Sequence, residues 1–330
     1  MVRFMPMLVK DRIADDESEM ICPHRKSGVT EVDVFLIGVP KAGTTWLSNV
    51  LDQHPEVGLS EPKEPNFVAS HKGTFERDEV EPDWPKYVDF FPRGGLKMDA
   101  SVHTFSCPVA PRRIQSNFPD ARFILCLREP VSRTVSHWNM ILSTGEDQEN
   151  NRDWRNFEEA WLDESLRADS LYGTSMTNWL EHFDIERFSI IDSSRMRSEP
   201  MVVLRELEGF LGIEEWNYDL NMDRHANAAS SNRKKTAVGT MVMFCFSLIP
   251  NFVKSPIVKF LQRRDWNIYR LPILSSEEEY VPLSDEHYSA CGGELCEEIS
   301  LFGSLTGFDH TDWESQIRSR VGSVSENRGE

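Results

Sequence analysis

The sequence has few basic residues relative to its acidic ones. Its 36 lysines and arginines stand against 54 aspartates and glutamates, which gives a formal net charge of −18 over 330 residues. Such a charge repels polyanions, so general binding to nucleic acid or to an anionic membrane surface is excluded. A local basic pocket for a small anion is still compatible with this balance.

Cysteine is scarce, and its spacing is not that of a metal site. None of the six cysteines forms a Cys-x-x-Cys pair, and no histidine and cysteine pattern completes a zinc site. Cys107 and Cys126 lie in or beside apolar runs, where cysteine is usually a small buried hydrophobe. The pattern predicts a reduced, cytoplasmic protein with no bound metal.

Long apolar segments are also missing. The first twenty residues carry scattered charges, which excludes a signal peptide. The most apolar stretch, residues 237–253, contains Pro250 and falls short of the roughly 20 residues that a membrane span needs. We therefore expect a buried or interfacial helix there, and no transmembrane anchor.

The sequence does contain a regular alternation of strand and helix patterns. Short runs rich in β-branched and aromatic residues predict strands, and apolar residues at helical spacing predict helices. Strands are expected at 32–38, 57–59, 96–100, 121–127 and 188–192, and helices at 44–53, 131–142 and 201–211. Strands that alternate with helices favour a three-layer α/β fold with a central parallel sheet.

The turn between the first strand and the first helix has the composition of an anion-binding loop. Gly38–Trp46 reads Gly-Val-Pro-Lys-Ala-Gly-Thr-Thr-Trp. The glycines let the backbone turn tightly, the helix N-terminus adds partial positive charge, and Lys41 adds a full one. The segment resembles a nucleotide P-loop, but that motif places its lysine directly after the second glycine, and Lys41 lies inside the loop.

A second cation follows the strand at 121–127. A nucleotide hydrolase needs an acidic residue at such a strand end to hold Mg²⁺, whereas this strand is followed by Arg128. An arginine there would repel a metal and attract a second phosphate. The sequence therefore predicts a ligand with two separated anionic groups and no metal.

Together the two motifs resemble those of sulfotransferases that use 3′-phosphoadenosine 5′-phosphosulfate (PAPS). Pro40–Leu47 resembles their 5′-phosphosulfate loop, and Leu127–Ser136 resembles their 3′-phosphate motif. The resemblance extends over about 32–313, and it is nearer to heparan-sulfate-type and bacterial members than to the cytosolic phenol and steroid enzymes. It implies an enzyme on a P-loop-like fold that moves a sulfuryl group from PAPS to a hydroxyl or an amine.

The resemblance also implies roles for individual residues. Lys41 would be the cation beside the bridging oxygen, and Thr44 and Thr45 would bind the 5′-phosphate. The implied cofactor contacts are Lys41, Ala42, Gly43, Thr44, Thr45, Trp46, Arg128, Ser136, Arg233 and Lys234.

Two of these assignments have a plain alternative. Trp46 matches the cytosolic enzymes, where this tryptophan stacks on adenine, but its spacing also suits a core aromatic of the first helix. Arg233 and Lys234 belong to a basic run that fits the family's basic loop loosely, and such a run is often a solvated turn.

Two residues are candidates for the base that removes the acceptor's proton. Glu64, within Lys63–Phe67, matches the catalytic glutamate of the heparan-sulfate-type enzymes, and we rank it first. His103 follows the strand after which the cytosolic enzymes place a catalytic histidine, and it is the second candidate. The alternatives are a solvated carboxylate and a structural histidine. Asp99–Ser101 lacks the lysine that heparan-sulfate-type enzymes often carry there.

Two other functions stay open, a nucleotide-dependent kinase and a non-catalytic nucleotide-binding protein on the same fold. The displaced Lys41 and the arginine at 128 disfavour the kinase, and the presence of both Lys41 and Glu64 disfavours the binding protein. The resemblance implies a small-molecule or glycan acceptor, and the net negative charge argues against a long polyanion such as heparan sulfate. Neither the acceptor nor the oligomeric state follows from the sequence.

We predict a single sulfotransferase domain over 31–314. An irregular lead-in at 1–30 precedes it, and a polar tail at 315–330 is expected to fray. Residues 236–270, apolar and then basic, depart most from the family and are expected to form a cap or an acceptor-side insertion.

Overall fold

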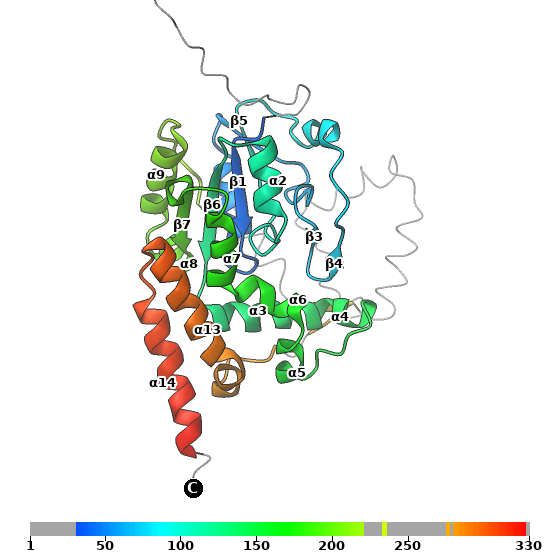
Figure 1. The fold of residues 1–330 in the computed structure, drawn as a ribbon, viewed down its shortest axis with the longest axis vertical. Coiled ribbons are helices and arrows are strands. Elements are labelled where there is room, and N and C mark those ends of the chain that lie inside the picture. The colour runs from blue at the N-terminus through cyan, green and yellow to red at the C-terminus, as the bar shows by residue number, and fades with distance from the viewer. Residues whose placement is uncertain (1–30, 221–232, 236–274, 278–279, 328–330) are drawn as a thin grey trace, which may run out of the picture.

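A five-stranded parallel sheet forms the centre of the molecule (Figure 1). The computed structural model describes residues 31–220, 233–235, 275–277 and 280–327. The strands are β1 (Val34–Gly38), β2 (Val57–Leu59), β5 (Leu96–Asp99), β6 (Arg122–Leu127) and β7 (Phe188–Asp192), in the order β2-β5-β1-β6-β7. Every neighbouring pair is parallel. The predicted three-layer α/β fold is therefore confirmed.

Helices cover the sheet and gather at one end of it. The longer ones are α1 (Thr44–Leu51), α2 (Ala110–Asn117), α3 (Pro130–Thr144), α7 (Tyr172–Leu180), α9 (Pro200–Leu211), α13 (Asp285–Thr306) and α14 (Thr311–Asn327). The short ones are α4 (Glu146–Glu149), α5 (Phe157–Trp161), α6 (Glu164–Arg167) and α8 (Ser193–Ser198), with 3-10 turns η1 (Trp84–Phe90), η2 (Ala168–Ser170) and η3 (Ile185–Arg187). Figure 1 shows α3 to α6 lying together beyond one end of the strands.

The central strands are buried on both faces, which explains their continuous apolar sequence. All five residues of β1 are buried, and all of β6 except its first residue. Phe35 of β1 lies opposite Phe123 of β6, with ring centroids 6.1 Å apart. Phe123 also packs against Phe188 of β7 and Trp179 of α7, so aromatic rings join the sheet to α7.

The chain changes direction across the sheet at β1. It leaves β1 for β2 on one side, returns through β5, and then crosses β1 to form β6 and β7 on the other side. Ligands of open α/β sheets bind beyond the carboxyl ends of the strands at such a switch. The loops after β1 and β6 are neighbours at this edge, because Gly38 pairs with Leu125.

The C-terminal segment is a helix, so the prediction of a fraying tail at 315–330 is wrong as far as Asn327. Helix α14 packs along α13, and Ile317 is fully buried between them. The approach is close: a Cβ on Gly292 of α13 would lie 2.9 Å from Ile317 Cγ2. Trp313, Ile317 and Val321 recur every four residues and form a narrow apolar stripe in a mostly polar sequence, which is why composition alone suggested a tail.

The remaining pieces are small hairpins. Strands β3 (His71–Lys72) and β4 (Glu76–Arg77) pair with each other, and β8 (Arg233–Lys235) pairs with β9 (Ser275–Glu277). Arg233 and Lys234, predicted from a basic run to contact the cofactor, lie on β8 beside α3, and that contact stays a prediction.

Some predicted features fall where the structure gives no description. The lead-in at 1–30, the apolar stretch at 237–253 and the cap at 236–270 lie outside the described residues. Within the described ranges, no helix combines the length and apolar character needed to cross a bilayer.

Candidate functional site

The loop between β1 and α1 is built to present backbone N–H groups. Gly38 has φ 148°, and a Cβ there would lie 2.5 Å from the Val102 carbonyl oxygen, so only glycine fits. Gly43, the N-cap of α1, has φ 86°, and no side chain caps the helix. The first-turn N–H groups of α1 therefore lack a side-chain acceptor, and together with the helix dipole they form an anion site.

Lys41 occupies the middle of this loop in an unusual backbone conformation. Its φ is 72°, a left-handed value that costs a non-glycine residue free energy and that concentrates at functional sites. Its Nζ lies 3.6 Å from Met140 Sδ on α3. Burial, together with the nearby charges of Arg128 and Arg133, lowers the pKa of Lys41. The negative charge of a bound anion would offset the loss of hydration and the repulsion from the two arginines.

Arg128 joins the end of β6 to this loop. Its Nη1 donates to the Lys41 carbonyl oxygen at 3.4 Å, and the Arg128 carbonyl accepts a hydrogen bond of 2.8 Å from the Tyr172 hydroxyl. The next helix, α3, is capped by Glu129, whose carboxylate accepts from the N–H groups of residues 131 and 132. A phosphate beside Arg128 would therefore be bound by side chains and not by the N-terminus of α3.

Ser136 lies on the face of α3 that looks toward the loop. It is half-buried and four residues before Met140, so the two share one helix face, and Met140 contacts Lys41. The structure thus brings Lys41 and Arg128 together at the carboxyl edge of the sheet and places Ser136 on the helix that follows Arg128.

The other predicted cofactor residues differ in exposure. Ala42 and Thr44 are buried, Gly43 and Thr45 are exposed, and Trp46 is half-buried against the core. Trp46 thus packs against the core with one part of its side chain and exposes another part to solvent. Arg233 and Lys234 lie on β8 next to α3, the helix that carries Ser136.

Glu64 sits in a firmly anchored loop after β2. Ser60 donates its N–H to the Met98 carbonyl at 3.0 Å, and the N–H of Asn66 donates to Ser101 Oγ at 3.0 Å. The Glu64 carboxylate forms an ion pair of 2.8 Å with Lys63, and both side chains are partly exposed. Glu64 is near enough to His103 for its charge to raise the pKa of that imidazole.

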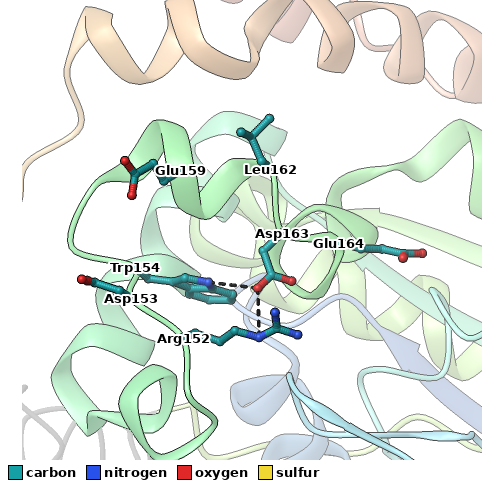
Figure 2. Close-up of a pocket in the computed structure, with 7 residues that line it drawn as sticks. All are labelled: Arg152, Asp153, Trp154, Glu159, Leu162, Asp163 and Glu164. Atoms are coloured by element: carbon teal, nitrogen blue, oxygen red, sulfur yellow. Dashed lines mark hydrogen bonds and ion pairs between the residues drawn. The ribbon is translucent and has the colours of Figure 1, made fainter.

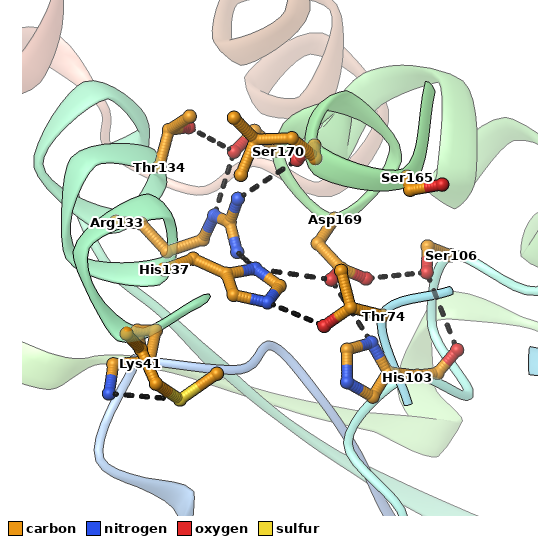
Figure 3. A network of polar contacts seen from close by, with 12 residues as sticks. Lys41, Thr74, His103, Ser106, Arg133, Thr134, His137, Ser165, Asp169 and Ser170 are labelled. Atoms are coloured by element: carbon orange, nitrogen blue, oxygen red, sulfur yellow. Dashed lines mark hydrogen bonds and ion pairs between the residues drawn. The ribbon is translucent and has the colours of Figure 1, made fainter. Parts of the chain in front are cut away.

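His103 belongs to a buried polar network (Figure 3). Its Nδ1 lies 3.1 Å from Asp169 Oδ2, and the other oxygen of Asp169 accepts a hydrogen bond of 2.6 Å from Ser106. On α3, Arg133 donates to His137 Nδ1 at 3.1 Å, and His137 Nδ1 is 3.7 Å from Asp169 Oδ2. The network lies beside Lys41, whose charge acts on His137.

Three residues of this network were not predicted as site residues from the sequence: Arg133, His137 and Asp169. Arg133 and His137 carried a weak signal, because they are four residues apart on a helix with many apolar residues; in the structure both are completely buried. Asp169 carried none, since it precedes α7 in an ordinary polar segment and meets His103 only in the folded chain.

A surface pocket lies elsewhere, around the turn between α5 and α6 (Figure 2). Asp163 accepts a hydrogen bond of 3.2 Å from Trp154 Nε1 and forms an ion pair of 3.4 Å with Arg152. The residues that line the pocket are Arg152, Asp153, Trp154, Glu159, Leu162, Asp163 and Glu164. It shares no residue with the loop or the network, so it is not part of the candidate site.

Known proteins resemble this chain in both sequence and fold. Mouse heparan sulfate glucosamine 3-O-sulfotransferase 3B1 is 31% identical over 189 residues, 54% of this chain and 46% of that protein. The bifunctional heparan sulfate N-deacetylase/N-sulfotransferase 1 of Caenorhabditis elegans is 26% identical over 197 residues, 57% of this chain and 23% of that protein. The chain spans about half of the length, or less, of these curated relatives.

A solved structure supports the same fold. The sulfotransferase from Alicyclobacillus acidocaldarius matches with a TM-score of 0.59, over 86% of this chain and 99% of that one, at 18% identity. Residues 31–238 match the model of the family described as the sulfotransferase domain, and this match covers more than half of the chain. The chain therefore belongs to the sulfotransferase domain family.

Proposed function

We propose that this protein transfers a sulfuryl group from PAPS to a hydroxyl or an amine of a small molecule or a glycan. The observation that carries the proposal is the junction of two cationic motifs: Arg128 reaches the carbonyl of Lys41 beside the uncapped N-terminus of α1. Members of the sulfotransferase family use PAPS, whose 5′-phosphosulfate and 3′-phosphate are two separated anions.

The residues present fit such a ligand. The phosphosulfate would be held by the N–H groups of the first turn of α1, the hydroxyls of Thr44 and Thr45 and the ammonium of Lys41. The 3′-phosphate would be held by Arg128 and Ser136, with the backbone of Arg233 and Lys234 nearby on β8. Trp46 offers a partly exposed ring for stacking on adenine.

Catalysis would rest on position and charge, as in phosphoryl transfer. PAPS supplies the activated sulfuryl group. Lys41 would neutralise the negative charge that grows on the leaving phosphate, because its partly buried ammonium has no acidic partner among the described residues. Glu64 and His103 stand near each other, and one of them would accept the proton of the attacking group.

The acceptor can be found directly. The full chain would be incubated with sulfur-labelled PAPS and, in separate arms, with a metabolite extract and with heparan sulfate, and products would be identified by mass spectrometry. A labelled product that has gained one SO₃ unit supports the proposal and names the acceptor class. If PAPS is bound but no acceptor in either arm is labelled, the non-catalytic alternative is favoured.

The two-anion site predicts a strong preference for 3′-phosphoadenosine 5′-phosphate (PAP) over AMP. A charge-assisted contact to phosphate contributes roughly 1.5–3 kcal/mol, so Arg128→Ala should weaken PAP binding by about ten- to a hundredfold and leave AMP binding almost unchanged. Isothermal titration calorimetry measures both. The exposed Arg112 of α2 provides the matched control Arg112→Ala, which should bind like the wild type. Equal affinity of the wild type for PAP and AMP would contradict the site.

Transfer should not depend on a divalent metal. Arg128 stands at the strand end where a metal-dependent kinase would need a carboxylate, and its charge disfavours a cation there. Turnover measured in excess EDTA should equal turnover in buffer, and added Mg²⁺ should not stimulate it. Loss of turnover in EDTA that Mg²⁺ restores would favour the kinase.

The cytoplasmic location predicted from the cysteine pattern stays a prediction. Within the described residues, Cys107, Cys126, Cys291 and Cys296 are buried free thiols. Fractionation of the native host, with detection by an antibody, is the direct test.

A further inference from the structure

Asp169 is a buried carboxylate whose two oxygens are both engaged. It is 3% exposed, and it accepts from Ser106 at Oδ1 and faces His103 Nδ1 at Oδ2. Burial alone would raise its pKa, but the charges of His103 and Arg133 and the hydrogen bond from His103 lower the pKa of Asp169 well below its usual range. The group is therefore an anion inside the protein.

The network fixes the protonation of its two central histidines. Arg133 is always charged and can only donate, so His137 Nδ1 must accept its hydrogen bond, and His137 Nε2 carries the proton that it shares with Thr74 at 2.9 Å. His137 is thus neutral, and burial and Arg133 lower its pKa further. His103 is the opposite case, because its Nδ1 faces a carboxylate and must be the donor.

The second ring nitrogen of His103, Nε2, is the atom that can accept a proton. Figure 3 shows Nε2 on the side of the ring that faces away from Asp169, and this atom makes no hydrogen bond with the described residues. Since Nδ1 holds the proton in the neutral ring, Nε2 carries a lone pair. The same ring lies near Glu64 and in the network beside Lys41.

Charged and titratable groups face His103 from several elements. They are Asp169 on η2, Glu64 after β2, Arg133 and His137 on α3, His71 on β3 and Glu146 on α4. Burial lowers the pKa of His103, but Asp169 and Glu64 outweigh this effect and raise the pKa above its ordinary value. By contrast, burial and Arg77 lower the pKa of His71 to about 4. His103 is thus the more basic of these imidazoles.

We propose that Asp169 is a positioning residue of the transfer reaction: it holds Nδ1–H of His103, the candidate base, and directs the Nε2 lone pair to the acceptor. This inference rests on the proposed function. The oxygen or nitrogen of the acceptor forms a bond to sulfur, the bond from sulfur to the phosphate oxygen of PAPS breaks, and PAP leaves with that electron pair. The acceptor's proton moves to His103 Nε2, and the imidazolium is balanced by Asp169, which stays ionised.

The first test needs neither an acceptor nor a variant of Asp169. In the full chain labelled with ¹⁵N-histidine, long-range ¹⁵N–¹H spectra report the tautomer and pKa of each ring, and His103→Gln identifies the signal. The expected result is an Nδ1–H tautomer for neutral His103, with a pKa above that of an ordinary histidine. An Nε2–H tautomer, or a pKa below the ordinary value, would overturn the pairing.

The second test uses the pH profile of turnover. His103 must be neutral to accept a proton, so activity should fall as pH drops through its pKa. Asp169→Asn removes the charge that raises this pKa, so the acidic limb should move to lower pH while the maximal kcat falls at least roughly tenfold. Asp163→Asn, in the surface pocket of Figure 2, removes a carboxylate outside the network and should leave the limb in place.

The outcomes separate the two proposals. If the wild type does not bind PAP or label any acceptor, the proposed function fails, whatever the spectra show. If transfer occurs and Asp169→Asn keeps the wild-type limb and kcat, the proposed function stands and Asp169 has only a structural role. Because Asp169→Asn leaves Arg133 without its nearby buried counter-charge, its folding is checked by circular dichroism, and the wild-type spectra decide the pairing if it does not fold.

Discussion

Lys41→Met is expected to lower kcat by about 10²–10³-fold while the protein folds at least as well as the wild type. Loss of one preorganised charge that faces a developing anion typically costs this factor. The folded state should not suffer, because burial and the charges of Arg128 and Arg133 already oppose the ammonium, as its lowered pKa indicates. Steady-state kinetics and the thermal midpoint, measured side by side, give the two values.

The matched control removes a lysine that has no part in the site. Lys86 lies in η1, exposed and paired with Asp83 at 2.7 Å, so Lys86→Met should leave kcat unchanged. If Lys41→Met keeps wild-type turnover, the loop does not stabilise the leaving group. If it unfolds the protein, Lys41 has a structural role in place of the proposed catalytic one.

His103→Asn is expected to lower kcat by about 10²–10⁴-fold, the usual contribution of a positioned base. PAP affinity should stay nearly unchanged, because His103 contacts Asp169 and not the cationic loop. Glu64→Gln should cost about tenfold or less, since Glu64 would act by raising the pKa of His103. His182→Asn, at a half-buried position beside Gln115, is the control and should behave as wild type.

This ranking reverses the one that the sequence suggested. Glu64 was placed first by its resemblance to a catalytic glutamate, but its carboxylate is paired with Lys63 at 2.8 Å, whereas His103 Nε2 makes no hydrogen bond with the described residues. If Glu64→Gln is inactive while His103→Asn turns over normally, the ranking from the sequence is right and Glu64 is the base. If both variants stay active, the base is neither residue.

The sequence predicted the sheet well because its strands are local patterns. The two central strands, β1 and β6, are almost continuous apolar runs that end at a turn, and burial on both faces requires only that the run be continuous. The loop at Gly38–Trp46 was predictable for a similar reason. Its glycine conformations and its helix N-terminus depend on neighbours in the chain, so composition and spacing contain the needed information.

The C-terminal helix depended on packing that no local pattern predicts. The C-terminal helix α14 exists because Trp313 and Ile317 dock on α13, where Gly292 lets the helices approach. In sequence these are a few apolar residues in and just before a polar tail, and helix formation by so narrow a stripe is stabilised by tertiary contacts.

By itself, the sequence determined the parallel α/β fold, the anion loop with Lys41 and the second cation at Arg128, because each of these is made by residues close together in the chain. Only the tertiary structure placed a buried carboxylate against His103, the contact on which the proposed proton transfer rests. Asp169 and His103 come from distant segments, and a buried carboxylate changes the basicity of an imidazole only when folding brings them within hydrogen-bond distance, here 3.1 Å, and removes the water between them.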